Sequence, residues 1–157
     1  MVKRLIEFGP SAYSVECSVS FVAPTLALVR SIPLFSNRFC YGDLLRGVDD
    51  DAHNVFTVHD VAGHGGYSSF ALLLHPAIDD TLLASVCDRL DTMNAIYEAV
   101  RFAQSTILKI AALPTDLPGI NALISKGNHD TWIYARLHES PGFVDYVPRS
   151  EDRVATG

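Results

Sequence analysis

Residues 67–90 read YSSFALLLHPAIDDTLLASVCDRL, and the change of pattern inside this stretch decides the predicted fold. Its first nine residues are apolar on both faces, which is typical of a central β-strand. After Pro76 the apolar side chains recur at helical spacing instead. Asp79 and Asp80 place carboxylates in the first turn of this segment, where the helix dipole favours negative charge. The stretch therefore predicts a buried strand followed by a helix.

The residues that follow predict two more strands, a second helix and a last strand. Residues 95–102 and 106–112 have strand character, and the link between them is short enough for a hairpin. Asp116 is a predicted cap of the second helix, and residues 131–138 alternate as a strand. The order strand, helix, strand, strand, helix, strand is that of a ferredoxin-like βαββαβ unit.

The chain before residue 67 predicts short strands. Residues 14–21 alternate between polar and apolar side chains, which indicates a half-buried strand. Residues 43–48 and 55–61 predict the two arms of a hairpin, with the acidic run 49–51 as its solvated tip. We expect these strands to form a small, partly open barrel.

The predicted fold class is therefore α+β, with a small antiparallel β-subdomain followed by a ferredoxin-like βαββαβ half. The β-rich subdomain is expected over residues 1–66 and the ferredoxin-like subdomain over residues 67–140. Residues 141–157 show no periodicity, and we expect them to form a loose C-terminal tail.

Composition narrows the classes of partner. The chain has 157 residues and a formal net charge of -6. An acidic surface does not favour a phosphate backbone, so nucleic acid is an unfavoured partner. A basic protein, such as a toxin domain, suits this charge better.

The cysteines and the apolar runs indicate a cytoplasmic protein. Cys17, Cys40 and Cys87 are scattered and form no CxxC pair, so we expect reduced thiols. The N-terminus lacks an apolar run of signal-peptide length, and no apolar run is long enough to cross a bilayer. We expect no membrane association, and the oligomeric state stays open.

No complete catalytic or metal motif is present. The segments 42–47 and 126–130 resemble parts of the metallophosphoesterase motifs, but the D-x-H and G-H-x-H elements that such a two-metal site requires are missing. His59 and His64 lie on a predicted strand and its turn, whereas a zincin has its two histidines on a helix. We expect no catalytic residue, metal or cofactor, and we favour a protein that is not an enzyme.

Three short motifs, the runs 32–45 and 56–58 and the turn 63–65, resemble those of a known family. The family is a bacterial family of uncharacterised proteins, domain of unknown function 4265, and the resemblance covers about residues 12 to 138. The chain departs from the family at the turn, where Gly65, Gly66 and Tyr67 replace a hydroxyl residue and an arginine. The resemblance implies no activity, and it marks Asp43 and His64 as residues of interest.

Three functions remain open. The first is a non-catalytic protein-binding module, in particular an immunity protein that neutralises a bacterial toxin by binding it. Its binding residues would be exposed acids and an aromatic side chain, namely Asp49, Asp50, Asp51 and Tyr67.

The second function is a small-ligand-binding enzyme or sensor with a pocket between the two halves. Its polar groups would be Asp43, His59 and His64. The third is RNA binding on the ferredoxin-like sheet, where Tyr97, Phe102, Trp132 and Tyr134 supply aromatic rings.

Overall fold

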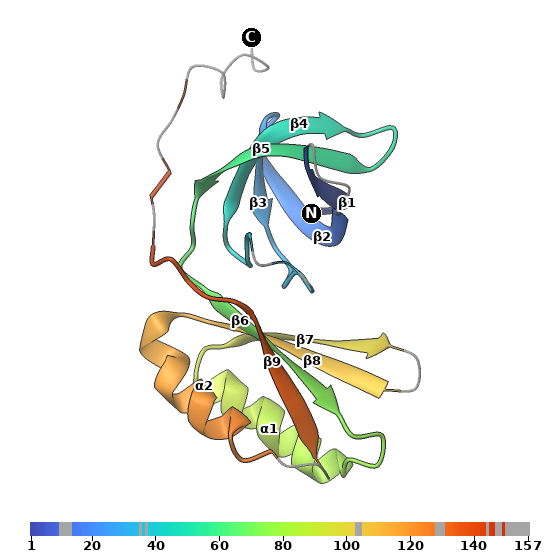
Figure 1. The fold of residues 1–157 in the computed structure, drawn as a ribbon, viewed down its shortest axis with the longest axis vertical. Helices are drawn as coiled ribbons and strands as arrows, with labels where there is room; N and C mark the ends of the chain where they lie inside the picture. The colour runs from blue at the N-terminus through green and yellow to red at the C-terminus, as the bar shows by residue number, and fades with distance from the viewer. Residues whose placement is uncertain are drawn as a thin grey trace.

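The computed structural model consists of a barrel and a sheet half, placed one above the other (Figure 1). It describes residues 1–9, 14–34, 36, 38–102, 105–127, 131–143, 145, 146 and 149. The chain passes from the barrel to the sheet once, and the described residues after the last strand return to the barrel, where Arg149 forms an ion pair with Asp60. Within this part of the chain, no helix is both long and apolar enough to cross a membrane.

The upper half is a closed barrel of five strands in the order of the sequence. The strands are β1 (Val2–Phe8), β2 (Ser14–Ala23), β3 (Leu26–Val29), β4 (Leu44–Asp50) and β5 (Val55–Gly63). Neighbouring strands are antiparallel, and β1 closes the ring by pairing parallel to β5. Apolar side chains that alternate along each strand fill the interior, among them Ile6, Val19, Val29, Leu45 and Phe56.

The lower half is a four-stranded antiparallel sheet with two helices on one face (Figure 1). Its strands are β6 (Ser68–Leu74), β7 (Ile96–Phe102), β8 (Ser105–Ala112) and β9 (Trp132–His138), in the order β7-β8-β6-β9. The helices are α1 (Asp80–Thr92) and α2 (Leu117–Ile124), and a 3-10 turn (Pro114–Asp116) precedes α2.

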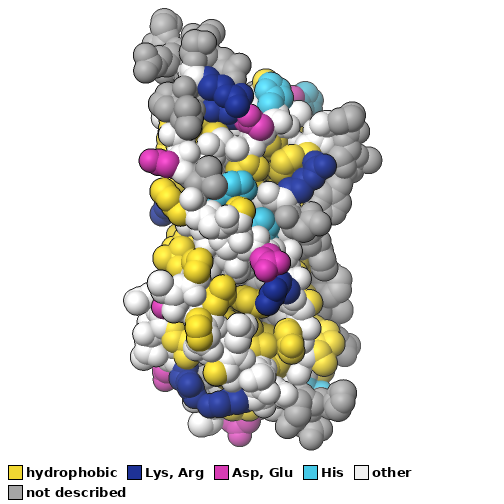
Figure 2. All heavy atoms as spheres, turned by 60° about the vertical axis from the view of Figure 1, so that its left-hand side comes forward, with side chains coloured by type: hydrophobic (Ala, Val, Ile, Leu, Met, Phe, Trp, Pro, Cys, Tyr) yellow, Lys and Arg dark blue, Asp and Glu magenta, His cyan; other side chains and the backbone are white. Residues whose placement is uncertain are grey.

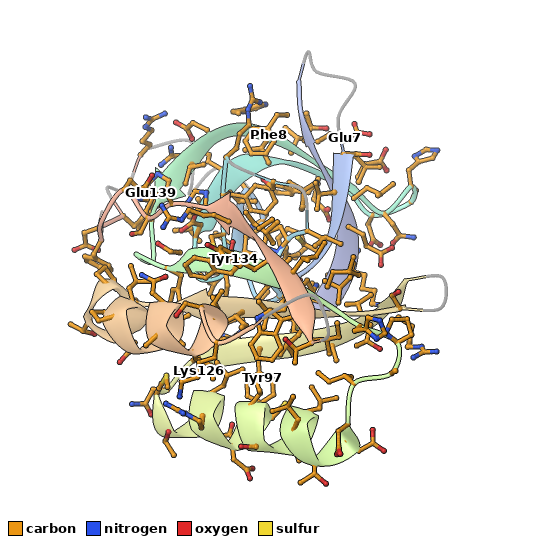
Figure 3. All side chains as sticks on the ribbon, turned by 60° about the horizontal axis from the view of Figure 1, so that its bottom comes forward. Glu7, Phe8, Tyr97, Lys126, Tyr134 and Glu139 are labelled. Carbon is orange, nitrogen blue, oxygen red and sulfur yellow. The ribbon has the colours of Figure 1, made fainter. Side chains whose placement is uncertain are left out.

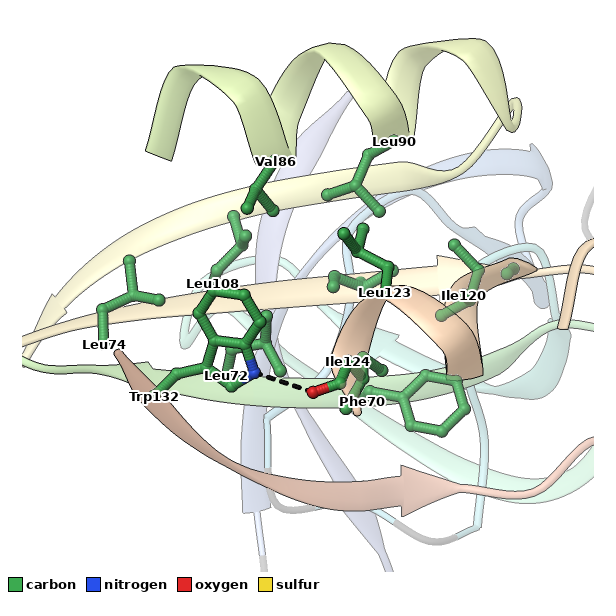
Figure 4. Packing of buried hydrophobic residues seen from close by; sticks show 12 residues of the cluster. Phe70, Leu72, Leu74, Val86, Leu90, Leu108, Ile120, Leu123, Ile124 and Trp132 are labelled. Carbon is green, nitrogen blue, oxygen red and sulfur yellow. Dashed lines mark hydrogen bonds between the residues drawn. The ribbon is translucent and has the colours of Figure 1, made fainter. Parts of the chain in front are cut away.

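The core of the lower half lies between the sheet and the helices (Figure 4). Leu72 and Leu108 from the sheet meet Val86 and Leu90 of α1. Trp132 closes one end of this core, and its indole nitrogen donates to the carbonyl oxygen of Ile124 at 3.0 Å. Because the faces of a strand alternate, the residues next to these core positions point towards the barrel.

The fold class predicted from the sequence is wrong for the molecule as a whole. The described chain is mostly β, with nine strands and two α-helices, and it is a closed barrel joined to a four-stranded sheet rather than an α+β protein with a ferredoxin-like half. The expected partly open barrel is closed, because residues 2–8 form the strand β1, which the apolar pattern did not reveal.

Two local predictions also need correction. The acidic run was expected at a solvated tip, but Asp49 and Asp50 belong to β4, and the turn comes after them. Asp116 was expected to cap α2, but its side chain makes no capping hydrogen bond. At α1, by contrast, the Asp79 carboxylate accepts from the backbone N–H of Thr81 at 2.6 Å, in the manner of an N-cap.

Candidate functional site

A cleft of about 490 Å³ lies between the outer face of β2 and the side of β7 and β8 that faces away from the helices. The barrel contributes residues 14–18 and Lys3 to its walls. The loop after β3 contributes Ser31 and Leu34, and the sheet contributes Glu98, Val100 and Lys109. The cleft therefore exists only because the two halves lie against each other.

A polar network formed by Lys109, Glu98 and the backbone of Ile32 borders one side of the cleft and links the two halves. Lys109 donates to the carbonyl oxygen of Ile32 at 2.8 Å and forms an ion pair with Glu98 at 3.0 Å. The Glu98 carboxylate also accepts from the backbone N–H of Ile32, at 3.1 Å from Oε2. Glu98 and Lys109 lie directly opposite each other on β7 and β8, where side chains of neighbouring strands are close enough to interact.

The cysteine in the cleft wall is a weak nucleophile. Burial raises the pKa of the Cys17 thiol to about 12, and its hydrogen bond with Ser31 offsets only part of this effect. The Ser31 hydroxyl oxygen accepts from the backbone N–H of Ser18 at 2.9 Å. The thiol is therefore protonated at neutral pH, and the wall offers serine hydroxyls and charged groups for binding.

An apolar contact beside the cleft fixes the relation of the two halves. Ile32 and Cys40 from the barrel side pack against Ala111 of β8. Tyr41 and Tyr67 flank this contact, with their rings 5.1 Å apart in an edge-to-face arrangement. Tyr67, predicted as an exposed protein-binding residue, is half-buried, and burial raises the pKa of its hydroxyl.

The predicted pocket residues lie outside this cleft. Asp43 is buried and accepts from the backbone N–H groups of Cys40 and Gly65, each at 2.9 Å. His64 Nδ1 lies 3.3 Å from the same carboxylate, whereas His59 is exposed on β5. The structure thus brings Asp43 and His64 together where the chain leaves the barrel, and neither they nor His59 line the cleft.

The predicted acidic binding residues take part in ion pairs on the barrel. The buried Arg4 guanidinium donates to both carboxylate oxygens of Asp49, at 2.8 and 3.2 Å, and to Asp51 at 2.6 Å. Its two remaining N–H groups donate to the Lys3 carbonyl and to Asn54. Asp50 pairs with His53 instead, and this hydrogen bond holds the pKa of the Asp50 carboxyl below its usual range.

The aromatic residues expected to bind RNA do not share one face. Tyr97 lies on the helix side of the sheet, where its hydroxyl donates to Asp91 of α1 at 3.0 Å (Figure 3). Trp132 is buried in the core, and Tyr134 is exposed on the edge strand β9. The side chain of Phe102 lies outside the described residues. This arrangement does not form a stacking platform for bases.

No metal site is evident in the described part of the chain, where no three His, Cys, Asp or Glu side chains gather closely enough to hold an ion. Residues 128–130, which complete the second phosphoesterase-like fragment, lie outside the described residues.

Comparison with known proteins bears on the fold alone. No protein-family profile and no curated protein matches the sequence. Among solved structures, a hypothetical protein from Neisseria gonorrhoeae has a similar fold, with a TM-score of 0.57 and 14% sequence identity. The similarity covers 89% of this chain and 97% of the other. The similarity in fold therefore extends over both the barrel and the sheet half of this chain.

Proposed function

We propose that this protein binds a small polar ligand in the cleft between the barrel and the sheet. The observation that supports the proposal is the cleft itself, which is lined by both halves and bordered by the Glu98–Lys109 pair. Its volume of about 490 Å³ is within the range of roughly 300–1,000 Å³ that is common for ligand pockets.

The chemistry of the walls favours binding over a reaction. The thiol of Cys17 is protonated at neutral pH, and the charged side chains of the polar network, Lys109 and Glu98, form an ion pair with each other. Such groups orient a ligand by hydrogen bonds and charge, while Leu34 and Val100 supply apolar contact. We therefore propose a binding or sensing role for the cleft.

Filling the cleft tests this proposal. Val100→Trp places an indole in the cleft, and Val48→Trp is the matched control, because Val48 is exposed on the barrel and does not line the cleft. We expect a library of polar metabolites to contain compounds that raise the Tm of the wild type and of V48W but not that of V100W. If compounds stabilise V100W equally well, the ligand site lies elsewhere.

A protein partner is the second candidate function, and exposed apolar side chains favour it. Ile133 on the edge strand β9 is 56% exposed, and it pairs with Leu73 of β6, which is 39% exposed, so the two side chains lie on the same face of the sheet. Hydrophobic side chains gather over the sheet half in Figure 2. Together with the net charge of -6, this surface suits a basic partner, such as the toxin of an immunity pair.

Co-expression with the product of the gene immediately upstream tests the second function. We expect a complex that salt weakens and that rescues growth from a toxic product. Ile133→Lys should weaken the complex, whereas Val48→Lys, at an equally exposed position of the barrel, should leave it intact. A lack of both complex and rescue would leave the ligand cleft as the better proposal.

We also propose a cytoplasmic location, which the state of the cysteines supports. Cys17, Cys40 and Cys87 are free thiols, and free thiols are typical of reducing compartments. Fractionation of cells that produce the protein tests this location.

A further inference from the structure

The charged residues of the cleft come in two pairs of opposite sign. Lys109 and Glu98 form the inner pair, and Lys3 and Glu16 form an outer pair at the rim. The cleft is therefore formally neutral in a chain whose net charge is -6. A ligand that enters it meets ammonium and carboxylate groups in equal number.

The inner pair keeps unused hydrogen-bonding capacity. An ammonium group has three N–H donors, and the two bonds of Lys109 go to the Ile32 carbonyl and to Glu98. A carboxylate has about four acceptor positions, and Glu98 uses only part of them for Lys109 and the Ile32 N–H. Lys109 can thus donate a further hydrogen bond to a negative group, and Glu98 can accept a further hydrogen bond from a positive group.

The outer pair is weak and can open. Lys3 and Glu16 are 3.9 Å apart, and their side chains are 76% and 67% exposed. An exposed pair at this distance contributes little to stability, so a ligand can separate the two side chains at small cost. The inner side chains are far less mobile, because Lys109 is 12% and Glu98 is 30% exposed.

We propose that the ligand of this cleft is a zwitterion of the α-amino acid type with an apolar side chain. Its carboxylate pairs with Lys109, its ammonium group pairs with the Glu98 and Glu16 carboxylates, and its side chain contacts Leu34 and Val100. This inference rests on the proposed ligand-binding function and names the class of ligand.

Ligands with a single charge or none fit these walls less well. An anion can pair with Lys109 but is repelled by two carboxylates. A simple cation can pair with Glu98 but is repelled by two ammonium groups. A neutral ligand removes water from the charged side chains without replacing its hydrogen bonds. Only a ligand that carries both charges can pair with Lys109 and with the Glu98 and Glu16 carboxylates at the same time.

A set of matched ligands tests the inference. The protein amino acids are first compared by the rise in Tm that each causes, and the amino acid with the largest effect is taken into calorimetry. For phenylalanine the matched compounds are phenethylamine, 3-phenylpropanoate and N-acetylphenylalanine amide, which lack one or both charges. We expect each to bind at least about tenfold more weakly than the amino acid.

Two variants connect the binding to the cleft. Glu16→Gln changes an exposed rim residue, so the fold should persist while binding of the zwitterion weakens and binding of the carboxylate analogue does not. Val100→Trp should abolish binding of the zwitterion, and Val48→Trp should not.

The possible failures are distinguishable. If no amino acid binds, or if the singly charged analogues bind as tightly as the zwitterion, the assignment of the ligand class is wrong. The ligand-binding function would still stand if other metabolites stabilised the wild type and V48W but not V100W. Both the ligand-binding function and the zwitterion assignment would be wrong if no compound stabilised the wild type and V48W more than V100W.

Discussion

Arg4 explains why the sequence did not reveal the first strand. Residues 2–8 read VKRLIEF, and the inward set includes Arg4 and Ile6, while Val2 and Leu5 are exposed. A buried charge among the inward positions removes the apolar alternation by which a strand is recognised. Its partners Asp49 and Asp51 are more than forty positions away along the chain, so no local pattern links them to Arg4.

Replacing Arg4 should destabilise the barrel. Arg4→Met leaves Asp49 without its bidentate partner and removes a contact that joins β1 to the end of β4, so we expect a loss of about 2 kcal/mol in the free energy of unfolding. Urea denaturation measures it. Lys3→Met, at the exposed neighbouring position, is the control and should change stability little. Equal stability of the two variants would contradict a structural role for the Arg4 network.

The buried thiols predict a loss of stability at high pH. Burial raises the pKa of Cys17 and of Cys40 from 9.0 to about 12, so above pH 9 the unfolded chain releases these protons while the folded chain keeps them. Stability contributed by the two thiols is complete below pH 9 and declines as the pH rises towards 12, by at most about 1.4 kcal/mol per pH unit and thiol.

Urea denaturation at several pH values between about 8 and 11, below and above the unfolded pKa of 9.0, measures this decline. The C17A/C40A double variant is the control, because it lacks both thiols and should lose less stability over the same interval. If both proteins lose stability in parallel, other groups account for the decline.

At the scale of elements, Gly127 and Trp132 join the second helix to the last strand. A Cβ atom on Gly127 would lie 2.0 Å from Nε1 of Trp132, and this indole nitrogen donates to Ile124 at the end of α2. The sequence predicted a glycine stop near this position, and α2 ends a few residues before it. The contact with Trp132 could not be predicted, because it depends on how β9 returns beneath the helix.

Gly127→Ala should therefore disturb the core of the lower half. We expect a loss of about 1–3 kcal/mol, because the methyl group cannot fit unless the indole moves. The chain has one tryptophan, so its fluorescence reports on this contact directly, and an emission shift should accompany the loss. Gly9→Ala is the control, since the nearest atom to its Cβ would be 3.8 Å away. An unchanged emission spectrum in G127A would contradict the close packing of Trp132.

Local patterns predicted most elements but not the residues that line the cleft. The alternation of residues 14–21 and the helical spacing after Pro76 correspond to β2 and α1. Lys109 carried one local signal, a single charge between apolar residues of β8, which indicates a buried partner. The partner could not be identified, because Ile32 and Glu98 come from different elements and meet only in the folded molecule.

At the scale of the whole molecule, the polar network of Lys109, Glu98 and Ile32 couples the two halves. Lys109→Met leaves the Glu98 carboxylate without its cation, so we expect a loss of about 1–3 kcal/mol. In the double variant K109M/E98Q the unpaired charge is gone, and part of the stability should return.

Thermal unfolding followed by tryptophan fluorescence and by far-UV circular dichroism measures this coupling. Trp132 reports only on the sheet half, whereas the dichroism signal also includes the barrel. The two transitions should coincide in the wild type and separate in K109M. Coincident transitions in K109M would show that the apolar contact around Ile32 and Ala111 suffices to couple the halves.

The parallel pairing of β1 with β5 has a consequence during synthesis on the ribosome. Leu5 pairs with Val55, so β1 lacks its second neighbouring strand until about fifty further residues have been synthesised. Until then the nascent chain exposes β1 as an unpaired edge, the kind of surface on which strands of other chains pair. Closure of the barrel is therefore timed by translation of β5, and a pause before that strand lengthens the period in which the chain is open to aggregation.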